Sequence, residues 1–517
     1  MDIFAYEPLG FEGFLVKIEV DIRRGIPAVD VVGLAAASVR ESRERVRAAI
    51  RNSSFDFPQD RVLINLSPAD LPKEGSLYDL PIAAKILSAA GIVPDSGRSL
   101  LVIGELTLDG HVCPVRGTLP ALLQASRSGI RHFIVPEANY REAGRLREGS
   151  LFTIGHISEL PDIFLSIREG RAYSKSPGLQ LSHQEFSIES RSSVPPLDFS
   201  DYRGNEAVMR ALVVAAAGRH NLLLFGPPGS GKTMAALRFP SLLPNLNEAE
   251  ALEVAAIWSL RGRDYGEISP NFRPPFCSPH HSASLEGLVG GGRPPRPGEI
   301  SLAHRGLLFL DETPEFNHDV LQSLREPLER GSISVVRAGR VLQYPADFQL
   351  LLAANSCPCG NLGSSSKSCV CSPVEIQRYW KKLGGALLDR IDMRIPLLVP
   401  DAATALESPG QCQASLAKRV QKAAAIQLQR TAAEGGLFNS RLMPEMVKKY
   451  CLLDKDAERL FHAKSEELSL SMRACNAILK VGRTIADLEA SDIITAPILA
   501  EAAGYREYGD DDCYWPF

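Results

Sequence analysis

The hydrophobic pattern divides the chain into three parts. In residues 1–170, short apolar runs alternate with amphipathic stretches, which predicts strands at 14–21, 28–32 and 61–66 and a helix at 36–52. Between residues 198 and 400, apolar runs predict buried strands of a parallel sheet at 222–225, 306–310, 348–354 and 393–399. From residue 401 to 508 the spacing is helical, with helices predicted at 414–433, 443–453, 456–467, 471–489 and 497–506. We therefore predict an α/β fold: an α+β domain, a core with a parallel sheet and a C-terminal helical lid.

Two segments lack this periodicity. Residues 171–197 are rich in Ser, Pro and charged residues, which is typical of a linker. Residues 509–517 carry three consecutive aspartates and are expected to form a tail without a clear role.

Composition narrows the class of protein. A chain of 517 residues is too long for one core, and 45% hydrophobic with 23% charged residues is typical of soluble globular proteins. The net charge of −4 means that a nucleic-acid contact must come from local basic patches. No uncharged run approaches the roughly 18 residues of a membrane span, and the N-terminus carries no leader, so we expect a cytoplasmic protein without a membrane partner. In that compartment the ten cysteines are expected to be free thiols or metal ligands.

The strand predicted at 222–225 runs directly into a glycine-rich turn. The turn has the pattern G-x-x-x-x-G-K-[ST] and consists of Gly226, Pro227, Pro228, Gly229, Ser230, Gly231, Lys232 and Thr233. Glycines let the backbone wrap a polyphosphate, Lys232 supplies a positive charge, and Thr233 offers a hydroxyl to Mg²⁺. The pattern predicts ATP and Mg²⁺ as cofactors and ATP hydrolysis as the reaction.

Polar side chains stand at the ends of two further strands. Asp311 and Glu312 follow the run 306–310, where Asp311 is predicted to hold Mg²⁺ and Glu312 to deprotonate the attacking water. Asn355 follows the run 348–354 and is predicted to position that water against the γ-phosphate. These residues complete a predicted ATPase site.

Four cysteines lie within fifteen residues. Cys357, Cys359, Cys369 and Cys371 form two C-x-C pairs, and four thiolates suit a tetrahedral Zn²⁺ knuckle. The spacing differs from the usual C-x-x-C, so metal-free thiols remain the alternative. For His280 and His281, which have no spaced metal-ligand partner, we favour packing or hydrogen bonding over metal binding.

Two insertions in the core carry arginines. Residues 331–345 predict a hairpin whose tip bears Arg337 and Arg340, and the glycine-rich insert before the run 306–310 bears Arg293 and Arg296. Guanidinium groups pair with phosphate oxygens, so these four residues are the predicted DNA contacts. On the helix at 36–52, Arg40, Arg43, Arg47 and Arg51 share one face, which is either solvated or a further nucleic-acid contact.

Two other arginines have predicted roles in catalysis. Arg390 stands between two aspartates before the strand at 393–399 and is the candidate cation delivered to the γ-phosphate of a neighbouring subunit. An ordinary salt bridge is the alternative for this residue. Arg473 opens the helix at 471–489 and is predicted to reach back to the nucleotide.

The first domain resembles the proteolytic domain of Lon and its inactive relatives. The resemblance lies in residues 61–81, 101–128 and 133–136. Aligning these segments with the Lon domain puts the Lon nucleophilic serine at Leu77 and the catalytic lysine near Leu119. Leucine provides neither a hydroxyl nor an amine. Ser76 is one position away, but no lysine stands near residue 119. The domain is therefore predicted to be a structural or binding module.

The whole chain up to about residue 506 resembles the YifB/ComM family of magnesium-chelatase-like AAA+ proteins. The motifs are PHHSAS at 279–284, PGEISLAH at 297–304, LFLDE at 308–312, the cysteine pairs and LLDRID at 387–392. The resemblance implies a homohexameric ATPase with a helix-2 insert and a pre-sensor hairpin lining the pore. It also implies ATP-driven DNA branch migration that promotes integration of incoming DNA during natural transformation. Asn205 and residues 384–386 depart from the family pattern. A chelatase-type motor and an ATP-dependent protease are the competing functions, and Leu77 and Leu119 count against the second.

Overall fold

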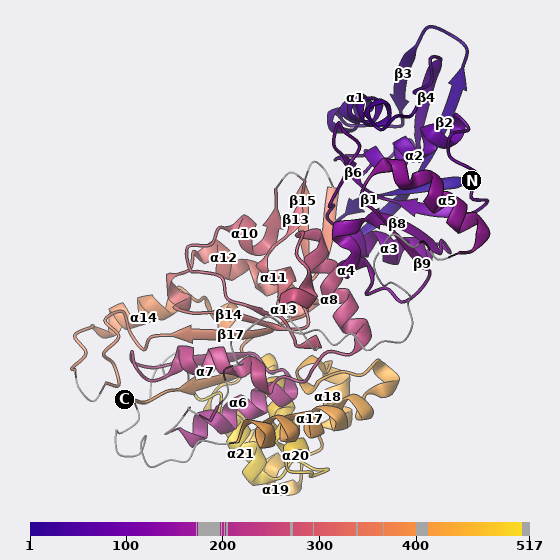
Figure 1. The fold of residues 1–517 in the computed structure, drawn as a ribbon. Helices are drawn as coiled ribbons and strands as arrows, with labels where there is room; N and C mark the ends of the chain where they lie inside the picture. The colour runs from indigo at the N-terminus through magenta and orange to yellow at the C-terminus, as the bar shows by residue number, and fades with distance from the viewer. Residues whose placement is uncertain are drawn as a thin grey trace.

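The computed structural model of the chain describes residues 1–171, 205–268, 272–292, 294–337, 340–364, 367–399 and 412–508, together with residues 173, 197, 199, 200 and 202. Figure 1 shows the N-terminal domain at one end of the molecule, the sheet of the core in the middle, and the C-terminal helices packed beneath that sheet. The predicted linker and tail, 171–197 and 509–517, lie almost wholly outside the described residues.

The N-terminal domain is built on a seven-stranded sheet in the order β3-β4-β2-β1-β5-β8-β9. Strands β1, β2 and β4 pair antiparallel, and β1, β5, β8 and β9 pair parallel, so the domain is α+β as predicted. Its strands are β1 Asp2–Leu9, β2 Glu12–Arg23, β3 Ala28–Val32, β4 Arg61–Ser67, β5 Ser99–Val102, β8 His132–Pro136 and β9 Ser150–Ile154, with the small hairpin β6 Glu105–Leu106 and β7 Val112–Cys113. Its helices are α1 Ala37–Asn52, α2 Asp79–Ala89, α3 Thr118–Arg127, α4 Tyr140–Ala143 and α5 Leu160–Glu169.

The core contains a five-stranded parallel sheet in the order β11-β14-β17-β10-β18. The strands are β10 Leu222–Phe225, β11 Phe276–Cys277, β14 Leu307–Leu310, β17 Gln349–Ala354 and β18 Met393–Pro396. Along β10, Leu222 and Leu224 enter one hydrophobic core while Leu223 and Phe225 enter another, because successive side chains point to opposite faces. The runs predicted to be strands are therefore buried on both faces.

Helices and two hairpins surround this sheet. The helices are α6 Glu206–Gly218, α7 Lys232–Arg238, α8 Glu248–Leu260, α9 Tyr265–Ile268, α10 Leu285–Val289, α11 Glu299–Leu302, α12 His318–Ser323, α13 Arg325–Arg330, α14 Pro373–Lys381 and α15 Gly385–Leu388. The hairpins are β12 Gly290–Gly291 with β13 Arg296–Pro297, and β15 Ser332–Arg337 with β16 Arg340–Pro345. Asn205 caps α6 by accepting from the Val208 N–H at 3.2 Å, which gives this departure from the family pattern a local role.

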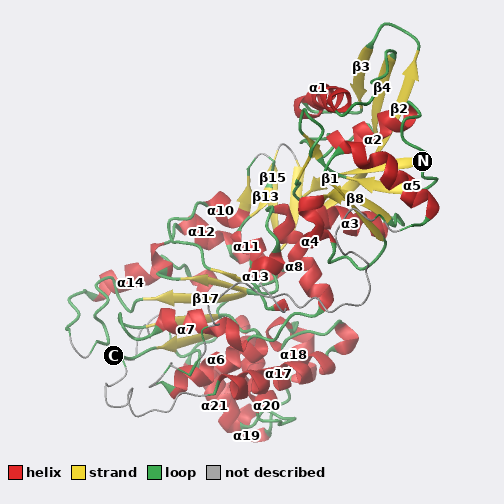
Figure 2. Cartoon of the chain, viewed as in Figure 1, coloured by secondary structure: helices red, strands yellow, loops and turns green. Residues whose placement is uncertain are grey.

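The C-terminal part is helical, and Figure 2 shows it as red helices joined by green loops. It consists of α17 Gln413–Arg430, α18 Pro444–Tyr450, α19 Lys455–Glu467, α20 Met472–Leu488 and α21 Ala496–Gly504. The predicted helix at 443–453 ends three residues early, because Leu453 pairs with Ile494 in a β-bridge. None of the helices in the described ranges combines the length and hydropathy of a membrane span.

The N-terminal domain contacts the core through α3 and through the turn between β1 and β2, among other segments. Helix α3 lies against α8, where the Gly117 N–H donates to the Ser259 carbonyl at 3.1 Å. The turn between β1 and β2 lies against β16, where the Phe11 N–H donates to the Gln343 carbonyl at 3.0 Å. A Cβ on Gly10 would come within 2.8 Å of that carbonyl oxygen, so the two backbones touch. The predicted DNA hairpin therefore lies against the Lon-like domain.

Candidate functional site

The glycine-rich loop connects β10 to α7. A Cβ at Gly226 would lie 2.1 Å from the Leu397 carbonyl oxygen, so only glycine fits there. Gly229 and Gly231 have φ values of +80° and +88°, in the left-handed region that disfavours other residues. A Cβ at Gly229 would meet no described atom within 4 Å, which leaves room for a ligand. The loop thus has the bend and the space that a polyphosphate requires.

Lys232 points back into this loop. Its Nζ donates to the carbonyl oxygens of Gly226 at 2.8 Å and Pro227 at 3.0 Å. Burial lowers the pKa of Lys232 to about 8. The ammonium group is thus held beside the loop by neutral acceptors, which phosphate oxygens can replace with a stronger charge-assisted contact.

The predicted magnesium ligands meet across the sheet. The Thr233 hydroxyl on α7 donates to Asp311 Oδ2 at 2.8 Å, and Asp311 follows β14 directly. A hydroxyl and a carboxylate are hard oxygen donors that suit Mg²⁺ beside a bound phosphate. The residues present therefore fit ATP with Mg²⁺.

Glu312 has a constrained backbone and a histidine partner. Its φ and ψ of +49° and +44° lie in the left-handed region, which is costly for a non-glycine residue and clusters at functional sites. Its Oε2 lies 3.4 Å from Nδ1 of His281, a residue that follows β11. Because β11 and β10 lie on opposite sides of β14, this contact draws the carboxylate away from the phosphate loop.

Asn355 stands between these groups. Strand β17 pairs with β10 on one side and β14 on the other, with Ala354 opposite Phe225. Since carboxyl ends of parallel strands share one edge of a sheet, Asn355 lies at the edge that carries the phosphate loop and Glu312.

Arg390 and Arg473 meet at the opposite edge. Both guanidinium groups contact Oε1 of Glu329, and Arg473 also contacts Asp389 Oδ2 at 3.2 Å. Arg390 precedes β18, whose Met393 lies opposite Leu222 at the start of β10. Roughly 13 Å of strand therefore separates this cluster from the phosphate loop beyond Phe225. Helix α20 begins beside Arg390, so Arg473 contacts Glu329 here, and its role at the nucleotide stays a prediction.

The four cysteines converge as predicted. Their Sγ atoms lie within 4.8 Å of one another, and three of the separations are 3.4, 3.6 and 3.7 Å. A tetrahedral Zn²⁺ with bonds of about 2.3 Å places its sulfur ligands about 3.8 Å apart, so the group fits zinc. Hydrogen bonds from the backbone of Asn361 and Val370 lower the pKa of Cys359 to about 6, which favours the thiolate. A Cβ on Gly360 would lie 3.1 Å from the Pro228 ring, so the cluster sits on the phosphate loop.

The structure describes only some of the arginines that are predicted to contact DNA. Arg293 and the side chain of Arg337 lie outside the described residues. Arg340 on β16 and Arg296 on β13 are half-buried. Arg340 faces the N-terminal domain, where its charge lowers the pKa of the buried Glu7 carboxyl against the larger effect of burial, which raises it to about 7.

The Lon-like domain lacks a nucleophile at the predicted position. Leu77 stands at the nucleophile position, Leu119 at the lysine position is fully buried, and the Ser76 hydroxyl donates to the Glu105 carboxylate at 2.5 Å rather than to a lysine amine. The buried Lys73 ammonium contacts carbonyl oxygens of Gly33 and Pro68. These contacts agree with a domain that has no Ser–Lys dyad.

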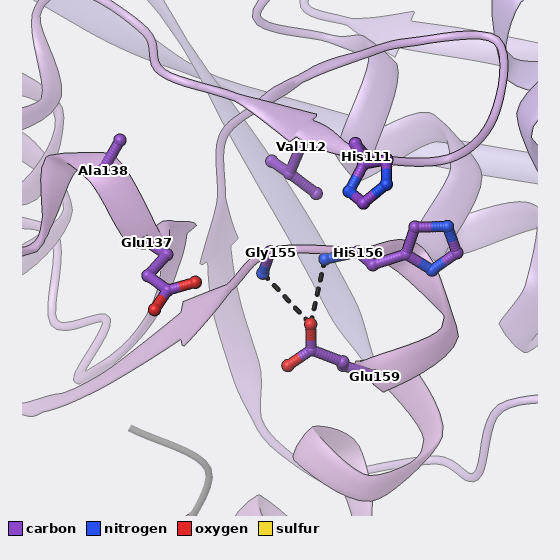
Figure 3. Close-up of a pocket in the computed structure, with 7 residues that line it drawn as sticks. All are labelled: His111, Val112, Glu137, Ala138, Gly155, His156 and Glu159. Carbon is purple, nitrogen blue, oxygen red and sulfur yellow. Dashed lines mark hydrogen bonds between the residues drawn. The ribbon is translucent and has the colours of Figure 1, made fainter. Parts of the chain in front are cut away.

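A hollow of about 550 Å³ in this domain is lined by His111, Val112, Glu137, Ala138, Gly155, His156 and Glu159. Figure 3 shows Glu159 accepting from the backbone N–H groups of Gly155 and His156, at 3.2 and 2.9 Å. The His156 ring lies within hydrogen-bond distance of Ser158 Oγ and the Asp109 carbonyl. These polar groups stabilise the local turn, and none of the seven residues that line the hollow is a Ser, Thr, Cys or Lys.

Three contacts escaped the sequence analysis: His281 with Glu312, Glu329 with two arginines, and Tyr202 with the phosphate loop. A Cβ on Gly231 would lie 3.4 Å from the Tyr202 ring. This buried ring therefore packs beside the phosphate loop. An aromatic residue just before the first core helix could have indicated this packing in the sequence. The other two contacts join distant segments and had no local signal.

Comparisons with known proteins agree with this geometry. Profiles described as "Magnesium chelatase, subunit ChlI", "Subunit ChlI of Mg-chelatase" and "Magnesium chelatase, subunit ChlI C-terminal" match residues 198–404, 18–139 and 410–506. The chain is 42% identical to "Uncharacterized protein YifB" of Salmonella typhimurium over 96% of this chain and 95% of that protein. It is 41% identical to "Competence protein ComM" of Haemophilus influenzae over 98% and 97% of the two chains. A Lon protease of Chloroflexus aggregans matches 30% of this chain at 27% identity, covering 20% of its own length. The chain therefore belongs to the YifB/ComM family of magnesium-chelatase-like AAA+ proteins, with a Lon-protease-like N-terminal domain.

Proposed function

We propose that this protein is a hexameric ATPase that drives DNA branch migration during natural transformation. The similarity to a competence protein over nearly the full length supports the biological process. The observation that carries the assembly is the position of Arg390 and Arg473, which contact Glu329 at the sheet edge opposite the phosphate loop of their own chain. In a ring, that edge faces the nucleotide of the next subunit, so the arginines act across the boundary.

The residues of one site divide the work of hydrolysis. Lys232 and the loop backbone hold the β- and γ-phosphates, and Thr233 with Asp311 holds Mg²⁺, which neutralises charge as the phosphoryl group is transferred. Asn355 orients the attacking water, and Glu312 takes its proton after leaving His281. Arg390 and Arg473 of the neighbouring chain stabilise the charge on the γ-phosphate. The four cysteines would hold Zn²⁺, which would stiffen the segment that packs on the phosphate loop through Gly360 and Pro228.

The hairpin β15–β16 is the proposed DNA-contacting element of the ring. Two arginines at a turn suit a phosphate backbone because guanidinium pairs with phosphate oxygens without reading bases. Its contact with the N-terminal domain at Gln343 holds the second strand of the hairpin in place.

The test measures ATP turnover with and without a four-way DNA junction. Turnover should rise with the junction and should not rise with unfolded protein or a porphyrin-loading partner; either of the latter responses would favour the protease or chelatase function. Glu312→Gln should retain ATP binding and lose turnover, whereas Lys232→Ala should weaken ATP binding itself. Inactive Arg390→Ala and Glu312→Gln chains should regain some turnover when mixed, because some interfaces then pair an intact base with an intact arginine. Mixed rings that stay inactive would refute action across the boundary.

A further inference from the structure

Three arginines from three segments gather where the N-terminal domain meets the core. Arg116 lies in the loop between β7 and α3, Arg261 caps the C-terminus of α8, and Arg296 lies on β13 of the glycine-rich insert. Figure 1 shows β13 and β15 at the end of the core that faces the N-terminal domain. The cluster thus forms only when the two domains pack together.

The elements around the three arginines are in contact, since α3 packs against α8 and α8 packs against β13. A Cβ built on Gly262 would lie 2.9 Å from Arg116 Nε and 3.0 Å from its Cγ, so the Arg116 side chain crosses the backbone directly after Arg261. Burial lowers the pKa of Arg296, and the positive charges of Arg116 and Arg261 lower it further. The position of Arg116 is fixed by hydrogen bonds on the adjoining residues, including Gly117 N–H to the Ser259 carbonyl.

The cluster carries almost no compensating negative charge. Among the described residues, no carboxylate lies within 4.0 Å of the Arg116 or Arg296 guanidinium nitrogens, and Arg261 has Glu299 only at 4.0 Å. Elsewhere at the same interface Arg145 pairs with Asp264 at 3.0 Å, so ion pairs do form between these domains. Like charges held together without a counter-ion favour binding of an anion.

We propose that Arg116, Arg261 and Arg296 form a binding site for the phosphate backbone of DNA, so that the Lon-like domain is part of the DNA-contacting surface. This inference rests on the proposed DNA function. The site is continuous with the predicted DNA elements, since β12 of the same insert contacts β15 of the hairpin. An arginine guanidinium group can donate two hydrogen bonds to two phosphate oxygens. Contacts to phosphates position a duplex without reading its base sequence.

The experiment measures binding of a fluorescent four-way junction to the full-length protein across a salt series. Arg116→Ala and Arg261→Ala should each reduce the slope of log affinity against log salt by about one unit and weaken binding about fivefold at 0.15 M salt. Arg116→Lys should keep the slope, since it keeps the charge. Arg127→Ala, an exposed arginine on α3 of the same domain, should leave both quantities unchanged. All variants should retain the wild-type basal ATP turnover, which also shows that they are folded.

The outcomes separate the inference from the function on which it rests. Wild-type binding with unchanged slope and affinity in Arg116→Ala and Arg261→Ala would overturn the site and leave the DNA function standing. No binding of the junction by the wild type would overturn both. Displacement of the junction by tripolyphosphate at constant ionic strength, lost in both alanine variants, would reassign the site to a small phosphate anion.

Discussion

Glu7 is a buried carboxylate at the contact between the N-terminal domain and the hairpin. It is 7% exposed, and its Oε2 accepts from the Tyr78 hydroxyl at 2.5 Å and the Glu74 N–H at 3.0 Å. Burial raises the pKa of Glu7 to about 7, against the lowering effects of these two hydrogen bonds and of Arg340. The raised pKa means that the folded state binds a proton that the unfolded state has lost above its own pKa of 4.5. The contribution of Glu7 to the free energy of unfolding is therefore fully present below pH 4.5 and is lost as the pH rises through 7.

The size of this effect follows from the shift. Between pH 5 and pH 8 the charged carboxylate should cost the folded state about 2.5 kcal/mol more, from linkage between pKa values of about 4.5 and 7. Glu7→Gln keeps an acceptor for Tyr78 and removes the charge. We expect this variant to unfold roughly 5–10 °C above the wild type at pH 8 and much closer to it at pH 5.

Thermal unfolding of the full chain at both pH values, followed by near-UV circular dichroism, measures the difference. Glu74→Gln, which neutralises the exposed neighbour and keeps Glu7, is the matched control and should follow the wild-type curve closely at both pH values. Arg340→Ala should enlarge the pH dependence, because it removes the positive charge that lowers the pKa of Glu7. A Glu7→Gln variant that follows the wild-type curve at both pH values would refute the reasoning.

Three further predictions concern the motor. Purified protein should contain about one Zn²⁺ per chain by elemental analysis and Cys359→Ser should lose it; a fully active metal-free protein would contradict this. His281→Ala should raise DNA-independent ATP turnover about two- to fivefold by freeing Glu312 from a half-exposed pair, whereas His280→Ala should not; equal rates in the two variants would remove His281 from the site. Glu329→Gln should raise ATP turnover by a similar factor, since it frees Arg390 and Arg473, and should reduce its stimulation by DNA; unchanged turnover and stimulation would show that the carboxylate does not restrain them.

The ATP site was predictable because local sequence determines it. The loop requires glycine where Gly226 approaches Leu397 and where Gly229 and Gly231 have positive φ, and such requirements leave a pattern in adjacent residues. Asp311 and Asn355 were predictable for a related reason: each follows a continuous apolar run, and parallel strands bring their carboxyl ends to one edge.

The contacts that the sequence did not reveal join segments far apart in the chain. Glu329 meets Arg390 across 61 positions and Arg473 across 144, and Glu7 accepts from a backbone N–H 67 positions away. A charged residue on a short surface helix looks the same in the sequence whether it is solvated or holds two arginines. The contacts of Arg473 were hidden for the same reason, since helical periodicity predicts α20 but gives no information about which edge of the sheet its first turn meets.

The position of Glu329 links the proposed subunit boundary to the hairpin. Glu329 is the penultimate residue of α13, and β15 begins at Ser332, so only Arg330 and Gly331 separate the two. The carbonyl of the preceding residue, Leu328, accepts from Arg441 of the C-terminal domain at 3.1 Å, which ties the same turn to the helical lid. If the arginines leave Glu329 for the phosphate of a neighbouring subunit, the turn loses two charged partners directly before the hairpin. Because β16 is hydrogen-bonded to the Lon-like domain at Phe11, the resulting movement must either carry that domain along or break this contact. In the proposed ring, this route would couple the Lon-like domain to the ATP site of the neighbouring subunit through fewer than twenty residues of chain.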